Sequence, residues 1–176
     1  DVTGVQTCAL PIFNCFLYGG LGAYLSGVSF VVLRVLEVPP HLFGLVFGAI
    51  MLGNISGYVL SSRIVTRLGL DATLTVGIAG AAAAGVLLAA FAWIGIYHVV
   101  TLVAPMMAYM FSLSLAGPQA VAGALTPFPR AAGTASSLMG FVQSLTSAAV
   151  GMGVALFFDG TPRALASFVC LMGICG

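Results

Sequence analysis

Long apolar runs separated by short polar breaks dominate this sequence. A helix needs about 20 mostly apolar residues to cross a bilayer, and it satisfies its own backbone hydrogen bonds there. Barrel strands are only about 10 residues long and alternate strictly, whereas these runs are about twice as long and do not alternate. The pattern therefore predicts an all-α integral membrane protein with helices over about 13–33, 42–62, 72–94, 99–125, 133–158 and 164–176.

The breaks between these runs are short, so sequential helices are expected to be antiparallel neighbours in a six-helix bundle. "RIVTRLGLD" over 63–71 and "TPFPRA" over 126–131 are expected to be loops. The last run stops inside an apolar stretch, "CLMGICG", so the sixth helix is expected to be truncated.

The arginines of the breaks give a weak signal for orientation. The loops on one side carry Arg63, Arg67 and Arg130, and those on the other side carry Arg34 and Arg163. Cytoplasmic loops have an excess of Lys and Arg. This comparison places the loops of Arg63 and Arg130 in the cytoplasm.

Composition leads to the same class of protein. The chain is 61% hydrophobic and 5% charged, it contains no lysine, and its mean hydropathy is +1.18. An ordinary soluble domain carries roughly a quarter of charged residues, so five arginines and four acids could not cover a water-facing surface. The net charge of +1 and the absence of a basic patch argue against nucleic acid as a partner.

The first twelve residues, "DVTGVQTCALPI", require separate treatment. They lack the basic and apolar regions of a signal peptide. They match the translation of a common sequencing-library adapter, so we expect residues 1–12 to be a non-native artefact and residues 13–176 to form the transmembrane bundle. The natural protein would then extend upstream.

Three amides lie inside the apolar runs, namely Asn54, Gln119 and Gln143. An unpartnered amide in hydrocarbon costs several kcal/mol, so these side chains are expected to face other helices or a wet cavity. They could form hydrogen bonds between helices, or they could line the path of a substrate.

Small residues recur at helical spacing in two of the runs. The pairs Gly44/Gly48 and Gly53/Gly57 predict close helix packing, which could also allow helices to slide during a conformational cycle. The fifth run carries a small, mildly polar stripe that is expected to face protein or water: Ala132, Ser136, Gly140, Ser144, Ala148 and Gly151.

Candidate catalytic chemistry is missing from the pattern. Glu37, Asp71 and Asp159 all fall in expected loops, and the sequence shows no nucleophile–base pair, metal-spaced cluster or phosphate-binding loop. The cysteine spacing matches no metal site or disulfide framework. We therefore expect no enzyme activity, no metal and no cofactor.

A family resemblance emerges from three stretches. "PFPRAAGTASSLMGFVQ" over 127–143 resembles the start of helix eleven in the Bcr/CflA drug-resistance transporters of the major facilitator superfamily. "AYLSGVSFVV" over 23–32 is similar to helix seven, although Val28-Ser29 replaces the family's Ser-Pro pair. The stretch 41–69 is similar to helix eight and its cytoplasmic loop, and the resemblance assigns a loop motif to Gly57, Arg63, Arg67 and Gly69, with Arg130 in the next cytoplasmic loop.

This resemblance implies that the six runs are helices seven to twelve, the C-terminal half of a twelve-helix transporter. By analogy, the first, second, fourth and fifth runs would line the cavity, and the third and sixth would be peripheral. The candidate substrate-path residues are Tyr24, Asn54, Tyr109, Gln119 and Gln143. The family's proton-handling carboxylate is expected in the absent N-terminal half.

The leading hypothesis is a fragment of a proton-coupled exporter of drugs or other small molecules, working by alternating access in a bacterial inner membrane. Its partners would be the lipid bilayer, the missing six-helix half, the substrate and protons. The alternative is a self-contained small membrane protein that oligomerises through its glycine faces as a scaffold or channel.

Overall fold

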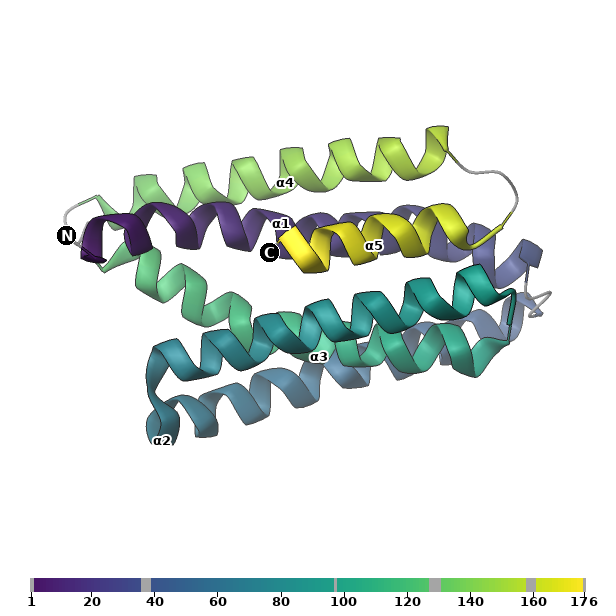
Figure 1. Ribbon diagram of the computed structural model, residues 1–176, viewed down its shortest axis with the longest axis horizontal. Coiled ribbons are helices and arrows are strands. Elements are labelled where there is room, and N and C mark those ends of the chain that lie inside the picture. The colour runs from purple at the N-terminus through teal and green to yellow at the C-terminus, as the bar shows by residue number, and fades with distance from the viewer. Residues whose placement is uncertain (1, 36–38, 97, 127–130, 158–160, 176) are drawn as a thin grey trace.

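The structure is a computed structural model that describes residues 2–35, 39–96, 98–126, 131–157 and 161–175. Its described residues form helices and short connections, without a strand, so the all-α prediction is confirmed. The helices, shown in Figure 1, are α1 (Val2–Phe30) with a π-helical continuation (Val31–Val35), α2 (Pro40–Ile94), α3 (Val99–Leu125), α4 (Ala132–Leu156) and α5 (Arg163–Cys175).

Five segments are long and apolar enough to cross a membrane. They are Asn14–Leu33, His41–Arg67, Gly69–Ile94, Val99–Leu125 and Ala132–Leu156, and the shorter α5 follows them. Large apolar side chains remain exposed along these segments, as expected where lipid rather than water is the solvent.

Helix α2 contains two of these segments, which meet at Gly69. The expected loop over 63–71 is wrong, because the backbone is helical up to and beyond this single residue. Gly69 has φ 83° and ψ 174°, a conformation that only glycine adopts without strain. One residue therefore reverses the chain, as the fold of α2 in Figure 1 shows, and Arg63 and Arg67 lie on the helix with their side chains exposed.

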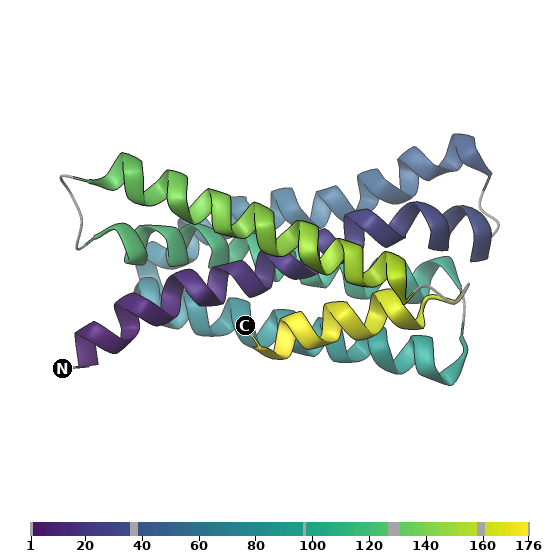
Figure 2. The ribbon, with the colours of Figure 1, turned by 90° about the horizontal axis from the view of Figure 1, so that it is seen from above.

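The bundle has two layers, which lie one above the other in Figure 1 and one in front of the other in Figure 2. One layer contains α1, α4 and α5, and the other contains α2 and α3. Helix α1 packs against α4, α5 and α3, while α5 also contacts α2. The side chains that are completely buried between the layers include Leu17, Tyr24, Met106, Tyr109 and Met110.

Glycines bring α2 against the backbone of α3. A Cβ atom added at Gly53 would lie 2.5 Å from the Met107 carbonyl oxygen, and one added at Gly57 would lie 2.5 Å from that of Phe111. In both pairs the α3 residue lies the same number of positions after the glycine. The part of α2 before Gly69 therefore runs parallel to α3, and successive contacts are one helical turn apart. The packing predicted for Gly53 and Gly57 is therefore confirmed, and such close approach of backbones drives helix association in lipid.

We call the parts of α2 before and after Gly69 its first and second legs. The second leg also packs closely on α3, against another side of that helix. A Cβ atom at Gly77 would lie 2.7 Å from the Ala116 Cβ and 3.0 Å from the Ser112 carbonyl oxygen. Gly44 and Gly48 behave differently, because no atom lies within 4 Å of a Cβ atom built at either position. Helix α3 is thus held between two glycine faces, while a third glycine pair remains open.

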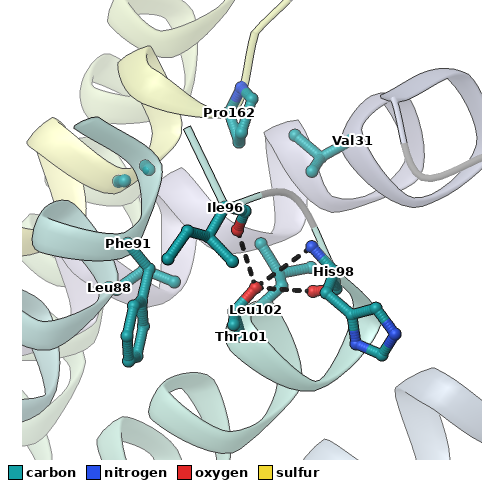
Figure 3. Close-up of a pocket in the computed structure, with 10 residues that line it drawn as sticks. Val31, Leu88, Phe91, Ile96, His98, Thr101, Leu102 and Pro162 are labelled. Atoms are coloured by element: carbon teal, nitrogen blue, oxygen red, sulfur yellow. Dashed lines mark hydrogen bonds between the residues drawn. The ribbon is translucent and has the colours of Figure 1, made fainter. Parts of the chain in front are cut away.

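The connection between α2 and α3 is capped at both helix ends. Gly95 ends α2 with φ 85°, and His98 begins α3 with a capping box in which Thr101 Oγ1 accepts the His98 N–H at 3.1 Å. His98 Nδ1 accepts the Val100 N–H at 3.3 Å. Figure 3 shows His98 and Thr101 beside a cavity of about 20 Å³.

The close contact at Gly57 predicts the effect of a larger side chain there. Gly57→Val would place methyl groups against the Phe111 carbonyl, which cannot move without displacing α3. Overpacking of this kind typically costs about 1–3 kcal/mol, so we expect a lower free energy of unfolding in detergent.

The control is Ala83→Val, which adds two methyl groups at an exposed position of the second α2 leg. The free energy of unfolding should change little. Equal stability of the two variants would contradict the packing described for Gly57.

Candidate substrate path

The five candidate path residues come from four helices. Tyr24 lies on α1, Asn54 on α2, Tyr109 and Gln119 on α3, and Gln143 on α4. Tyr24, Tyr109 and Gln119 are buried, whereas Asn54 and Gln143 are half-buried. The structure therefore divides them by burial, and their individual contacts show which are already committed to packing.

Tyr109 joins α3 to α1. Its hydroxyl donates to the Leu17 carbonyl oxygen at 3.1 Å, and its ring lies against Gly20, where a Cβ atom would overlap it. The hydroxyl of Tyr109 and the adjoining part of its ring are thus both in contact with α1. Its position supports the interpretation of an interhelical contact.

Gln119 takes part in a buried chain of hydrogen bonds between α3 and α2. Its Nε2 donates to Ser61 Oγ at 3.1 Å, and Ser61 Oγ donates to the Leu115 carbonyl oxygen at 3.2 Å. Ser61 follows Gly53 and Gly57 at the same four-residue spacing, and the carbonyl it meets continues the same register. A serine therefore adds a hydrogen bond where the two glycines allow only van der Waals contact.

Tyr24 is buried, and its hydroxyl has no hydrogen-bond partner among the residues that the structure describes. Its ring stacks on Phe47, with centroids 6.3 Å apart, and Phe47 stacks on Phe43 at 6.4 Å. Burying a hydroxyl without a partner costs about 1–3 kcal/mol on mutational scales. The hydroxyl is thus an unpartnered polar group that is enclosed by the packing around it.

Asn54 and Gln143 make no hydrogen bond with any residue that the structure describes. The helix of Gln143 packs on α1 through small groups, because Gly22 meets Ser147 and Gly151 meets Ser26. The small stripe of this helix is only partly inward-facing: Ser136 and Ser144 are exposed and bond carbonyls of their own helix. Contacts within the described chain thus account for part of the stripe, and its orientation toward protein or water stays a prediction.

Two tyrosines that the sequence pattern did not single out extend the polar cluster. The side chains of Tyr18 on α1 and Tyr58 on α2 are hydrogen-bonded, and Tyr18 lies 3.9 Å from a Cβ atom built at Gly117 of α3. Three helices therefore meet at this tyrosine pair. Tyrosines are common in apolar runs, so only the tertiary structure distinguishes them.

Asn14 is a further buried amide, and neither its Nδ2 nor its Oδ1 has a partner in the described part of the chain. It stands at the edge of the first apolar run, where an amide ordinarily reaches water, so its burial could not be expected from the sequence. Its complete burial makes it a polar group in need of a partner.

The residues of the expected loop motif occupy different environments. Gly57 is buried against α3, whereas Arg63, Arg67 and Gly69 are exposed at the end of the α2 legs. Arg130 lies outside the described residues. Within the described part of the chain, no three His, Cys, Asp or Glu side chains are grouped as a metal site would require.

Two drug-resistance proteins are similar to this chain. The chain is 26% identical over 181 residues to multidrug resistance protein D of Escherichia coli, and 31% identical over 142 residues to a bicyclomycin resistance protein homolog of Haemophilus influenzae. Its homologues are drug-resistance transporters of the Bcr/CflA type, in the major facilitator superfamily. The resemblance noted in the sequence is thus confirmed.

These alignments cover 92% and 80% of this chain but only 42% and 35% of the two relatives. The chain therefore spans less than half the length of either protein. No family model matches the sequence, and no solved structure shows significant similarity to it. Together with its apolar helices, the homology makes this a multi-pass membrane protein that contacts the lipid bilayer.

The buried bond between Ser61 and Gln119 can be measured with a double-mutant cycle. We expect Ser61→Ala and Gln119→Leu to show a coupling energy of about 0.6 kcal/mol, the average for interhelical hydrogen bonds in membranes. The free energy of unfolding in micelles would be compared for both single variants and the double variant. Fully additive effects would show that the bond does not contribute.

Proposed function

We propose that this chain is the C-terminal half of a proton-coupled exporter of drugs or other small molecules in a bacterial inner membrane. The observation that carries the proposal is its similarity, over 80–92% of its length, to two drug-resistance proteins. The missing N-terminal half, the substrate and protons would be its functional partners.

The open faces of two helices support the presence of a second half. The first leg of α2 and helix α4 are the least buried of the five long segments. Both carry glycines without neighbours within 4 Å of a built Cβ atom, namely Gly44, Gly48, Gly133 and Gly140. In transporters built of two bundles, the substrate site lies between the bundles. We propose that these two faces look toward the other half.

The inner contacts support motion of this half as one body. Gly53, Gly57 and Gly77 fix α3 against both legs of α2, and Tyr109 fixes α3 to α1. Alternating access proceeds largely by rigid-body rocking of one bundle against the other. In this mechanism the bundle tilts as a unit, and the substrate passes the side chains that its packing leaves unoccupied.

Those unoccupied groups are the Asn54 and Gln143 amides and the Tyr24 hydroxyl. The two amides can each offer a hydrogen bond to a substrate without first breaking one inside the bundle, and the buried Tyr24 hydroxyl can do so once the side chains around it move. Tyr109 and Gln119 would act as positioning residues, because their polar atoms already join helices. Asp71, the acid whose side chain is described, is exposed near a helix end, so we place the proton-handling carboxylate in the other half.

An oligomeric scaffold or channel remains the second candidate, and the open glycine pair Gly44/Gly48 is the feature that would serve it. The homology to drug-resistance proteins favours the exporter.

Transport by the full-length protein in everted membrane vesicles tests the proposal. A fluorescent cationic drug should accumulate in the vesicles when a proton gradient is imposed, and a protonophore should abolish the accumulation. Vesicles without the protein provide the baseline. Accumulation that persists with the protonophore would refute proton coupling, and none under any gradient would refute export.

The path residues are tested by the double variant Asn54→Leu, Gln143→Leu in the same vesicles. We expect transport to fall at least about tenfold for some substrates, the equivalent of losing roughly one hydrogen bond of 1.4 kcal/mol.

The control is Thr66→Val, Thr75→Val, which removes two exposed hydroxyls that only bond carbonyls of their own helix. This control should transport normally. If the amide variant also transports every substrate at the normal rate, Asn54 and Gln143 do not belong to the path.

A further inference from the structure

A groove of about 430 Å³ lies on the outside of the bundle, away from the candidate path. It forms where α2 and α4 end and α5 begins, three helix ends that Figures 1 and 2 show gathered at the same end of the molecule. Its lining consists of Trp93, Phe157, Arg163, Ala164, Ser167 and Phe168. The sequence analysis used Arg163 only for the orientation of the chain, and the proposed transport mechanism uses none of these residues.

The polar part of the groove is organised around the single tryptophan of the chain. The Arg163 guanidinium lies 5.6 Å from the centroid of the Trp93 ring, a distance at which the ring face attracts a cation. The Trp93 Nε1–H donates to Ser167 Oγ at 3.3 Å. Because this oxygen acts as the acceptor, the Ser167 hydroxyl proton remains free to donate to a third group.

Two sets of donors therefore converge on the groove, the Arg163 guanidinium and the Ser167 hydroxyl. Within the part of the chain that the structure describes, no carboxylate pairs with Arg163. A guanidinium held over an aromatic ring beside a hydroxyl donor suits an oxyanion with several acceptor oxygens, and a phosphate fits this requirement.

The apolar part of the groove is aromatic and open. The rings of Phe157 and Phe168 lie 6.2 Å apart, and Phe157 and Trp93 are 71% and 64% exposed. Tryptophan is enriched where membrane helices reach the headgroup region. Hydrocarbon chains thus cover the phenylalanines in the membrane, while Arg163 and Ser167 stand at the level of the headgroups.

We propose that this groove binds an anionic phospholipid. Its phosphate accepts hydrogen bonds from the Arg163 guanidinium and the Ser167 hydroxyl, and its acyl chain lies against Phe157 and Phe168. Charge complementarity selects an anionic lipid over a zwitterionic one, because the described lining of the groove offers a cation and contains no carboxylate to receive a positively charged headgroup. The inference does not depend on the proposed transport function.

The fluorescence of Trp93 can show which lipid lies in the groove. The full-length protein would be placed in nanodiscs containing phosphatidylglycerol or phosphatidylcholine with brominated acyl chains, which quench a tryptophan that they contact. The difference between the wild type and Trp93→Phe isolates the emission of Trp93 from that of any other tryptophan. We expect brominated phosphatidylglycerol to reach half-quenching at about fivefold lower mole fraction than brominated phosphatidylcholine, since one surface arginine is worth roughly 1 kcal/mol toward anionic lipid.

Arg163→Gln should abolish this preference, and Ser167→Ala should reduce it. Arg67→Gln, which removes the same charge from an exposed site on the α2 leg that precedes Gly69, is the matched control and should keep it. Helix content measured by circular dichroism verifies that each variant is folded, and the Ser167→Ala result decides the question if Arg163→Gln fails this check.

Three outcomes would overturn the proposal. The first is equal quenching of the wild type by both lipids, and the second is an unchanged preference in folded Arg163→Gln or Ser167→Ala. The third is loss of the preference on adding excess inorganic phosphate, which would show a site for free phosphate rather than for a lipid.

Discussion

Direct contact between glycines and a neighbouring helix backbone is the interaction on which this bundle depends. Lipid tails are as apolar as leucine side chains, so burial of apolar surface gives helices in a membrane little reason to associate. Gly53, Gly57 and Gly77 replace that driving force by letting α3 approach both legs of α2 at van der Waals distance. Any side chain at these positions would push α3 outward and disturb the helices that it contacts.

The same contact determines which polar groups remain available. Where α2 and α3 meet, the Gln119 amide and the Ser61 hydroxyl find partners, and Tyr109 does so where α3 meets α1. Asn54 and Gln143 lie beside these contacts and have no partner among the described residues. A polar group that is half-buried and unpartnered in lipid is costly, so its partner must come from outside the bundle. Close packing inside this half thus separates the side chains that hold it together from those that can act on another molecule.

The sequence predicted the helices well because run length and apolar character are local properties. It failed at 63–71, where two arginines and a glycine looked like a loop, because one residue with positive φ suffices to reverse the chain at Gly69. It also identified Gln119 and Gln143 as equivalent amides, although one is bonded and the other is not. That difference depends on which helix stands opposite, as do the pairing of Tyr18 with Tyr58 and the burial of Asn14, and a single sequence carries no record of it.

The two faces of the bundle solve the problem of polar groups in lipid in different ways. On the face toward the path, amides are placed at depth, where only a protein partner, a substrate or water can satisfy them. On the outer face, Arg163 and Trp93 stand at helix ends, where a headgroup can reach them. In the mechanism that we propose, the bundle must keep its depth in the membrane while its contacts with the other half change. Attachment of the outer rim to a lipid headgroup, through residues that take no part in the inner packing, would meet both requirements.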